Sequence, residues 1–170
     1  MPAVEEISES LIRENITRAV ADVFKTMMGR SAAPKAAGPG AAPETPGISP
    51  AQVVGTVGFI GDVNGLVYLY LDESFANQCT SQILGMSPFE LQTRGEGIVN
   101  DAIGELTNMV VGSFKNALCD AGYPCKLTIP SIMRGRNFCI QSTRMAERRS
   151  YRFTSGGHDV VTDIIIRSGD

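Results

Sequence analysis

The stretch from about residue 96 to residue 121 limits most strongly how this chain can fold. Its apolar side chains recur every three or four residues, which is the spacing of an amphipathic helix. Thr93 and Glu96 have the spacing of a capping box at its start, and Gly122 ends the pattern. We therefore expect a long helix whose inward residues are Val99, Ala102, Ile103, Leu106, Met109, Val110, Phe114, Ala117 and Leu118.

The other face of this predicted helix combines polar side chains with glycines. Because an α-helix turns ~100° per residue, Asp101, Glu105, Asn108 and Gly112 point away from the apolar seam, with Gly104 beside them. Glu105 and Asn108, at i and i+3, are neighbours on that surface. Each glycine costs roughly 0.5–1 kcal/mol relative to alanine, a loss that is offset where another surface must approach the helix backbone. Two alternatives remain: the glycines face another helix of this chain, or the polar pair is ordinary solvated surface.

The rest of the chain divides into segments with helix-like or strand-like patterns. Gly29 and Gly85 mark helix ends, Asp72 can cap a helix, and Gly65 can take a positive φ in a hairpin turn. The expected elements are helices over 5–28 and about 73–84, a hairpin of strands 52–61 and 65–72, and strands at 123–132, 138–141, 150–154 and 160–167.

Residues 30–48 differ in composition from both of their neighbours. They are rich in proline, alanine and glycine and contain almost no side chain that could pack in a core. This composition is typical of a flexible insert. We expect one α+β domain over residues 1–170, in which a β-sheet packs against two long helices and one shorter helix.

Composition and charge exclude several classes of function. A net charge of -3 indicates no basic surface for nucleic acid. No apolar run approaches the ~20 residues that a membrane span needs, and no secretory leader is visible. The four cysteines show no CxxC spacing and there is a single histidine, so a zinc site or a Cys–His nucleophile is disfavoured. We interpret the cysteines as small core residues of a protein in the reducing cytoplasm.

Most of the sequence, apart from residues 30–47, is similar to a known family. GEGIVNDAIGELTNMVVGSFKNAL, followed by KLTIPSI, resembles the CheC/CheX group of chemotaxis phosphatases. Its signature, D/S-x3-E-x2-N with a downstream proline in a strand, is matched by Asp101, Glu105, Asn108 and Pro130. The first helix carries no second Glu-x-x-Asn, so the resemblance is to the CheX type, with one active face per chain.

The resemblance implies a CheC-like fold and a phosphatase that acts on the phospho-aspartate of a CheY-like response regulator. Asn108 would orient the attacking water, and Glu105 would anchor the regulator, with Asp101, Gly104 and Gly112 at the contact surface. The regulator would supply its own Mg²⁺, so the chain would need no cofactor. The resemblance further implies a homodimer formed through paired strands. The alternative is a non-catalytic module on the same scaffold, either a receiver-binding adaptor or a part of a flagellar switch.

Overall fold

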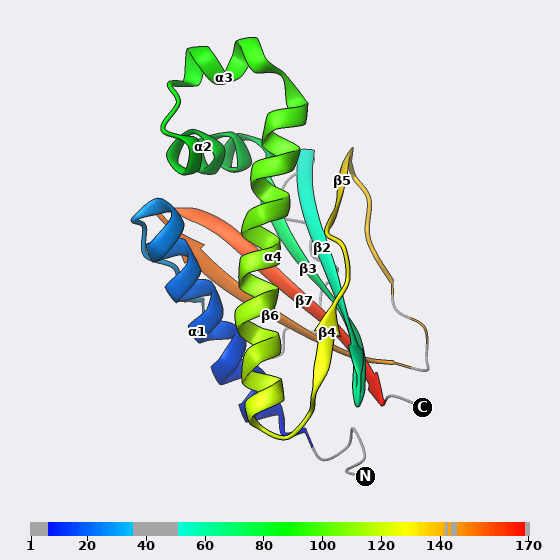
Figure 1. The fold of residues 1–170 in the computed structure, drawn as a ribbon. Coiled ribbons are helices and arrows are strands. Elements are labelled where there is room, and N and C mark those ends of the chain that lie inside the picture. Colours follow the sequence, from blue (N-terminus) through cyan, green and yellow to red (C-terminus); the bar gives the residue numbers. More distant parts are fainter. Residues whose placement is uncertain (1–6, 36–50, 142, 144–145, 169–170) are drawn as a thin grey trace.

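The computed structural model describes residues 7–35, 51–141, 143 and 146–168 of the 170-residue chain. Its strands form one seven-stranded antiparallel sheet in the order β1-β6-β7-β3-β2-β4, and β5 also pairs with β2 (Figure 1). The elements are α1 (Glu9–Met28), β1 (Ala33–Pro34), β2 (Ala51–Gly61), β3 (Val63–Asp72), α2 (Glu73–Leu84), α3 (Pro88–Arg94), α4 (Glu96–Asp120), β4 (Cys125–Leu127), β5 (Ser131–Arg136), β6 (Glu147–Ser155) and β7 (His158–Ser168).

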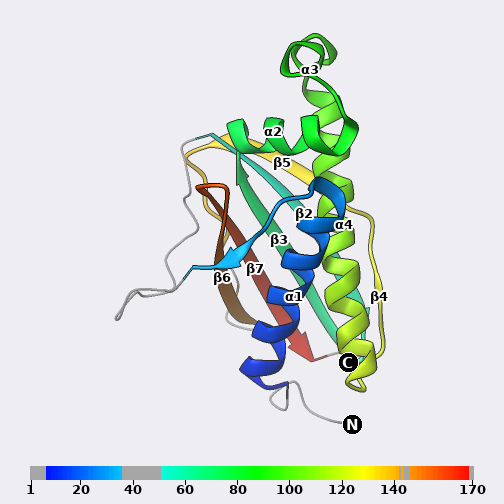
Figure 2. The ribbon, with the colours of Figure 1, turned by 90° about the vertical axis from the view of Figure 1, so that its left-hand side faces the viewer.

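The helices are grouped on one face and at one end of the sheet. Figures 1 and 2 show α1 and α4 next to each other against the same face, with α2 and α3 at one end of it. The main core lies between these helices and the sheet, where the Phe59 and Phe114 rings meet edge to face at 6.2 Å between centroids. The α+β class and the packing of a sheet against two long helices and a shorter one are thus confirmed.

A close contact between α4 and β2 fixes how the long helix lies on the sheet. Gly55 lies in the middle of β2, and a Cβ there would overlap the hydroxyl group of Thr107. Thr107 is fully buried, and its hydroxyl donates a hydrogen bond to the carbonyl of Ile103 at 2.7 Å. The missing side chain of Gly55 therefore lets α4 come close to the sheet at this level.

Side chains and glycines set the ends of the helices largely as expected. Asp72 accepts a hydrogen bond from the Phe75 amide at 2.7 Å and caps α2, and Gly85 ends α2 with φ 65°. Gly29 likewise ends α1 with φ 63°. The start of α1 differs from the expected residue 5, because the Ser8 hydroxyl caps a helix that begins at Glu9.

The predicted capping box at Thr93 and Glu96 is wrong. A fourth helix, α3, occupies residues 88–94, and Gly95, with φ 85°, separates it from α4. The hydroxyl of Ser87 accepts from the amide of Glu90 at 3.2 Å and so caps α3. Thr93 instead donates from its hydroxyl to the Glu90 carbonyl at 2.7 Å within the last turn of α3. The spacing of a capping box occurs twice in this region, and only the first copy starts a helix.

Two strand predictions need correction. The expected strand 123–132 is split into β4 and β5, which pair with different parts of β2. The segment 138–141 forms no strand, and its apolar residues Phe138 and Ile140 instead pack on a small cluster on the sheet face away from the helices. That cluster consists of Val54, Tyr70 and Val161.

Gly65 is needed for a different reason from the one predicted. It does not have a positive φ, and it lies in β3 paired with Phe59. A Cβ at Gly65 would overlap the Phe59 ring and approach the Ile165 carbonyl to 2.7 Å. Gly65 therefore provides space between neighbouring strands and does not form the turn.

The beginning of the predicted flexible insert belongs to the sheet. Ala33 and Pro34 form β1, which pairs with Thr154 and Phe153 of β6, and the Lys35 amide donates to the Arg152 carbonyl at 2.8 Å. Residues 33–35 of the predicted insert are therefore part of the sheet, and the flexibility of the insert stays a prediction. Residues 36–48 of that insert lie outside the described residues.

All four cysteines are free thiols, but they are not all core residues. Cys79 and Cys125 are buried as predicted, Cys119 is half-buried, and Cys139 is exposed. Burial raises the pKa of the Cys79 thiol to about 12. Burial, with a further contribution from Cys119, raises the pKa of Cys125 to about 11. Neither of these two thiols is a thiolate near neutral pH, which argues against their use as nucleophiles.

Candidate functional site

The outward face of α4 carries the predicted polar residues, which we call the α4 ridge: Asp101, Glu105 and Asn108. Asp101 and Glu105 are exposed, and Asn108 is half-buried. Within the described part of the chain, none of these three side chains makes a hydrogen bond or an ion pair. Their carboxylate and amide groups are therefore free to bind another molecule.

Space is present beside the ridge where the glycines lie. Gly104 exposes little surface of its own, yet a Cβ there would have no heavy atom of the described residues within 4 Å, apart from its chain neighbours and the backbone of its own helix. At Gly112 a Cβ would meet only the Leu127 side chain, at 3.7 Å. The alternative that these glycines face another helix is therefore wrong. The missing side chains at Gly104 and Gly112 leave room for a second molecule to approach the helix backbone.

One apolar residue of α4 lies differently from its prediction. Met109 was expected on the buried face, but 42% of its surface is exposed. It directly follows Asn108, so the ridge has an apolar side chain on one flank. The 3.6-residue period left this position ambiguous, because a methionine at the border of the apolar stripe fits either face.

A hydrogen bond joins α4 to the sheet one turn before Gly104. Arg134 of β5 donates from Nε to Oδ1 of Asn100 at 2.6 Å, and both residues are partly buried. We call this pair the Asn100–Arg134 clamp. Sequence analysis missed it, because Arg134 lay beyond the predicted strand and no local pattern links residues 34 positions apart.

The segment joining β4 to β5, residues 128–130, runs along the side of α4 (Figures 1 and 2). Two hydrogen bonds attach it to β2: the Thr128 amide donates to the Gly58 carbonyl, and the Gly58 amide donates to the Thr128 hydroxyl, each at 2.8 Å. Pro130, which the motif places in a strand, lies in this connection immediately before β5. Proline suits this place because it has no amide hydrogen to donate to a ladder.

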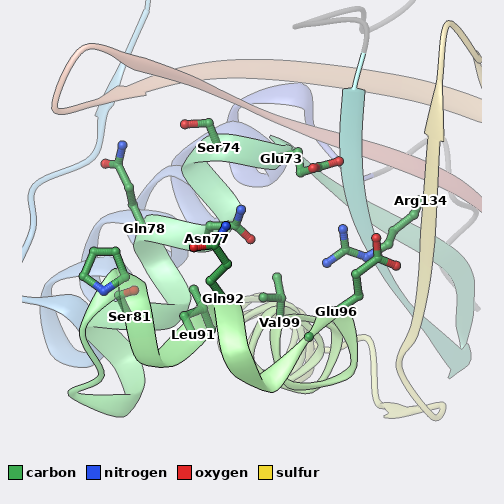
Figure 3. A pocket seen from close by; sticks show the side chains of 12 residues that line it. Glu73, Ser74, Asn77, Gln78, Ser81, Leu91, Gln92, Glu96, Val99 and Arg134 are labelled. Atoms are coloured by element: carbon green, nitrogen blue, oxygen red, sulfur yellow. The ribbon is translucent and has the colours of Figure 1, made fainter.

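A cavity of about 590 Å³ lies elsewhere, between α2, α3 and the beginning of α4 (Figure 3). Most of the residues that line it are polar, and the charged ones among them are Glu73, Glu96 and Arg134. Glu105 and Asn108 do not line it. The candidate site is therefore an exposed helix surface, which suits a macromolecular partner with a concave site better than a small ligand.

Metal ligands and membrane spans can be assessed for the residues that the structure describes. Among residues 7–35, 51–141, 143 and 146–168, no three histidine, cysteine, aspartate or glutamate side chains are close enough together to hold a metal ion. None of the helices in this part of the chain is long and apolar enough to cross a membrane.

The single histidine, His158, packs between an aromatic ring and a carboxylate. Its ring stacks on the Phe75 ring at 4.4 Å between centroids, and its Nδ1 lies 3.8 Å from a carboxylate oxygen of Asp72.

Solved structures show the same fold. A CheC-like superfamily protein from Shewanella sp. PV-4 is 23% identical with a TM-score of 0.78, covering 95% of this chain and 100% of that chain. CheX in a CheX–CheY–BeF3–Mg²⁺ complex from Borrelia burgdorferi is 20% identical with a TM-score of 0.68, covering 92% and 98%. FliY from Thermotoga maritima is 18% identical with a TM-score of 0.67, covering 95% and 92%.

Sequence comparison identifies the family directly. No curated protein matches the chain significantly in sequence. The sequence profile of the family described as chemotaxis phosphatase CheX, however, matches residues 53–154, which run from near the start of β2 to near the end of β6 and include all of α4. The chain therefore belongs to the CheX family of chemotaxis phosphatases.

Proposed function

We propose that this protein removes the phosphoryl group from the phospho-aspartate of a CheY-like response regulator. The observation that carries the proposal is the free Glu105–Asn108 pair on the α4 ridge, with open space at Gly104, in a member of the CheX family. The Borrelia burgdorferi relative was solved in a complex with CheY, BeF3 and Mg²⁺, which supports a regulator of this kind as the partner.

Asn108 is the residue that we assign to the attacking water. In the hydrolysis, the water oxygen bonds to phosphorus, the bond between phosphorus and the aspartyl oxygen breaks, and the products are a free carboxylate and inorganic phosphate. A neutral amide can accept one hydrogen bond from water and donate another, and it brings no negative charge towards the phosphoryl oxygens. Such transfers gain most from positioning and electrostatics, so one amide on a rigid helix is a sufficient contribution from this chain.

Glu105 is the residue that we assign to anchoring the regulator. The first twenty residues of α4 contain three carboxylates, those of Glu96, Asp101 and Glu105, and no lysine or arginine before Lys115. This charge pattern is complementary to a partner that presents a lysine ammonium group beside its acyl phosphate. The Mg²⁺ ion would be bound by the regulator, and this chain would act in the cytoplasm without a cofactor of its own.

The proposal is tested by measuring phosphate release from phosphorylated receiver domains of the same organism. We expect the wild-type chain to accelerate release and the Asn108→Ala variant to lose about 100-fold in rate, because the water is no longer positioned. Asn116→Ala is the matched control, since Asn116 is an exposed asparagine on the same helix. Equal rates for both variants, or no acceleration of any receiver by the wild type, would contradict the proposal.

A non-catalytic receiver-binding or flagellar-switch adaptor is the second candidate, favoured by the shared fold with FliY. Such a protein would bind the phosphorylated regulator through the same ridge and leave its phosphoryl lifetime unchanged. Binding measured by calorimetry alongside the decay rate separates the two candidates.

We also propose that the chain forms a homodimer through paired strands, as the CheX-type resemblance implies. In the described sheet, β1 lies at one edge and β4 and β5 at the other, so both edges offer strands for pairing. Light scattering should give twice the chain mass of 18.2 kDa, and a monomer at micromolar concentration would contradict this proposal.

A further inference from the structure

Ile129 is the most exposed large apolar side chain in the described part of the molecule, with 89% of its surface accessible. It lies between Thr128 and Pro130 in the connection from β4 to β5. A single exposed isoleucine is common on protein surfaces and needs no explanation by itself. Its position relative to the α4 ridge makes it informative.

The backbone on both sides of Ile129 is held in place. Thr128 is attached to Gly58 by two hydrogen bonds of 2.8 Å, one through its amide and one through its hydroxyl. On the other side, the ring of Pro130 restricts φ. An apolar side chain on such a restrained backbone loses little conformational freedom when a partner covers it, which favours its use in binding.

Two contacts bracket the position of Ile129 along α4. The Leu127 side chain lies 3.7 Å from the Cβ position of Gly112, and Arg134 binds Asn100 at 2.6 Å. Ile129 lies between Leu127 and Arg134 in the chain. The segment that contains it therefore lies beside the part of α4 between Asn100 and Gly112. Figures 1 and 2 both show the connection alongside this helix.

The same part of α4 contains Glu105 and Asn108. The exposed surface there consequently combines carboxylates and an amide with two apolar side chains, Ile129 and Met109, which is 42% exposed. A partner that fits this surface presents a cationic group opposite the carboxylates and an apolar patch next to it. The partner assigned to the ridge above meets the first of these requirements.

We propose that Ile129 is a docking contact for the phosphorylated receiver domain, which buries it against an apolar patch beside the acyl phosphate. The inference rests on the proposed function and adds a residue outside α4 that determines affinity. Ile129 does not touch the water that Asn108 orients. Its loss therefore weakens binding of the regulator and leaves the chemical step unchanged.

The experiment compares Ile129→Ser with Ile60→Ser in the full-length protein. Ile60 is a matched control: it is 62% exposed and lies in β2 next to Phe59, and because strand neighbours point to opposite faces it lies away from α4. We expect Ile129→Ser to raise KM for the phosphorylated receiver about tenfold with kcat within about twofold, and Ile60→Ser to change neither. Ile129→Leu should restore the wild-type KM.

Three results would overturn the inference. These are a KM for Ile129→Ser equal to that of Ile60→Ser, a fall in kcat at constant KM, or a lower melting temperature that accounts for the loss. The first would leave the proposed phosphatase activity intact, because that activity depends on Asn108.

If the wild type accelerates no receiver, the phosphatase proposal fails and the docking inference is tested by binding. The probe is then the unphosphorylated receiver with Mg²⁺ and beryllofluoride, titrated against wild type, Ile129→Ser and Ile60→Ser. Weaker binding by about tenfold for Ile129→Ser alone supports the docking contact. Equal affinities, or no binding by the wild type, overturn it.

Discussion

A glycine lies on each of two opposite sides of α4, and the space left by its missing side chain is filled on one side and open on the other. On the inward side, Gly55 of β2 leaves a space that the Thr107 side chain fills completely. On the outward side, Gly104 leaves a space that nothing in the described structure fills. The first glycine is explained by contacts within the chain, whereas the second is not.

This difference separates a structural requirement from a functional one. On the inward side, which we call the closed side, the contact of Thr107 with Gly55 sets the distance between α4 and the sheet. The helix therefore has no room to move closer to the sheet. The open side presents Glu105 and Asn108 without partners on a surface with room for close approach. A rigid support behind free polar groups is what a site that positions one water molecule requires.

The largest expected effect on stability comes from filling the closed side. Gly55→Ala should lower the free energy of unfolding by about 1–3 kcal/mol, because the new Cβ overlaps a buried threonine and the packed helix must shift. Urea unfolding followed by circular dichroism measures this change. Gly112→Ala is the control, since its Cβ would only touch Leu127 at 3.7 Å. Equal stability of Gly55→Ala and wild type would show that α4 does not press on β2.

A smaller effect is expected at the border between the two sides. Asn100→Ala removes the acceptor of the Asn100–Arg134 clamp and leaves a partly buried guanidinium group without this partner. We expect a loss of about 1–2 kcal/mol, as for a hydrogen bond to a charged group. Asn116→Ala, on the same helix, should change stability by less. The same urea titration checks both, and an equal loss for the two variants would contradict a role for the clamp.

The smallest effect on stability, with the opposite sign, is expected on the open side. Gly104→Ala should raise the free energy of unfolding by about 0.5–1 kcal/mol, since alanine favours the helix and its methyl group meets no neighbour. The same variant should raise KM for the phosphorylated regulator, because the methyl group lies where the partner approaches. Thermal unfolding and phosphate release measure the two quantities. A destabilised Gly104→Ala variant would remove the contrast between the two sides of α4.

The sequence predicted best those features that depend on neighbours along one helix or hairpin. The apolar stripe of α4, the Asp72 cap and the ends at Gly29 and Gly85 are all local, and all were found, apart from Met109 in the stripe. Features that depend on distant residues were missed or misread. The pairing of β1 with β6 and the Asn100–Arg134 clamp join residues that no periodic pattern connects.

Gly65 shows the same limit in a single residue. The residues before Gly65, DVN, are typical of a turn. Nothing in the sequence indicates that the Phe59 ring occupies the place of a Gly65 side chain. The split of the predicted strand 123–132 has a similar origin, because Thr128 pairs with Gly58 through its side chain as well as its backbone. Such choices are made by packing between strands, which overrides local preference.

For this protein, the order of residues alone determined that α4 is a long amphipathic helix with Asp101, Glu105 and Asn108 on its outer face, because helical periodicity is a property of consecutive residues. Only the tertiary structure decided that none of the described elements covers this face, that Gly104 borders open space among them and that Ile129 is exposed in the connection from β4 to β5. Coverage of a surface depends on where the other elements pack, and that information is spread over the whole chain.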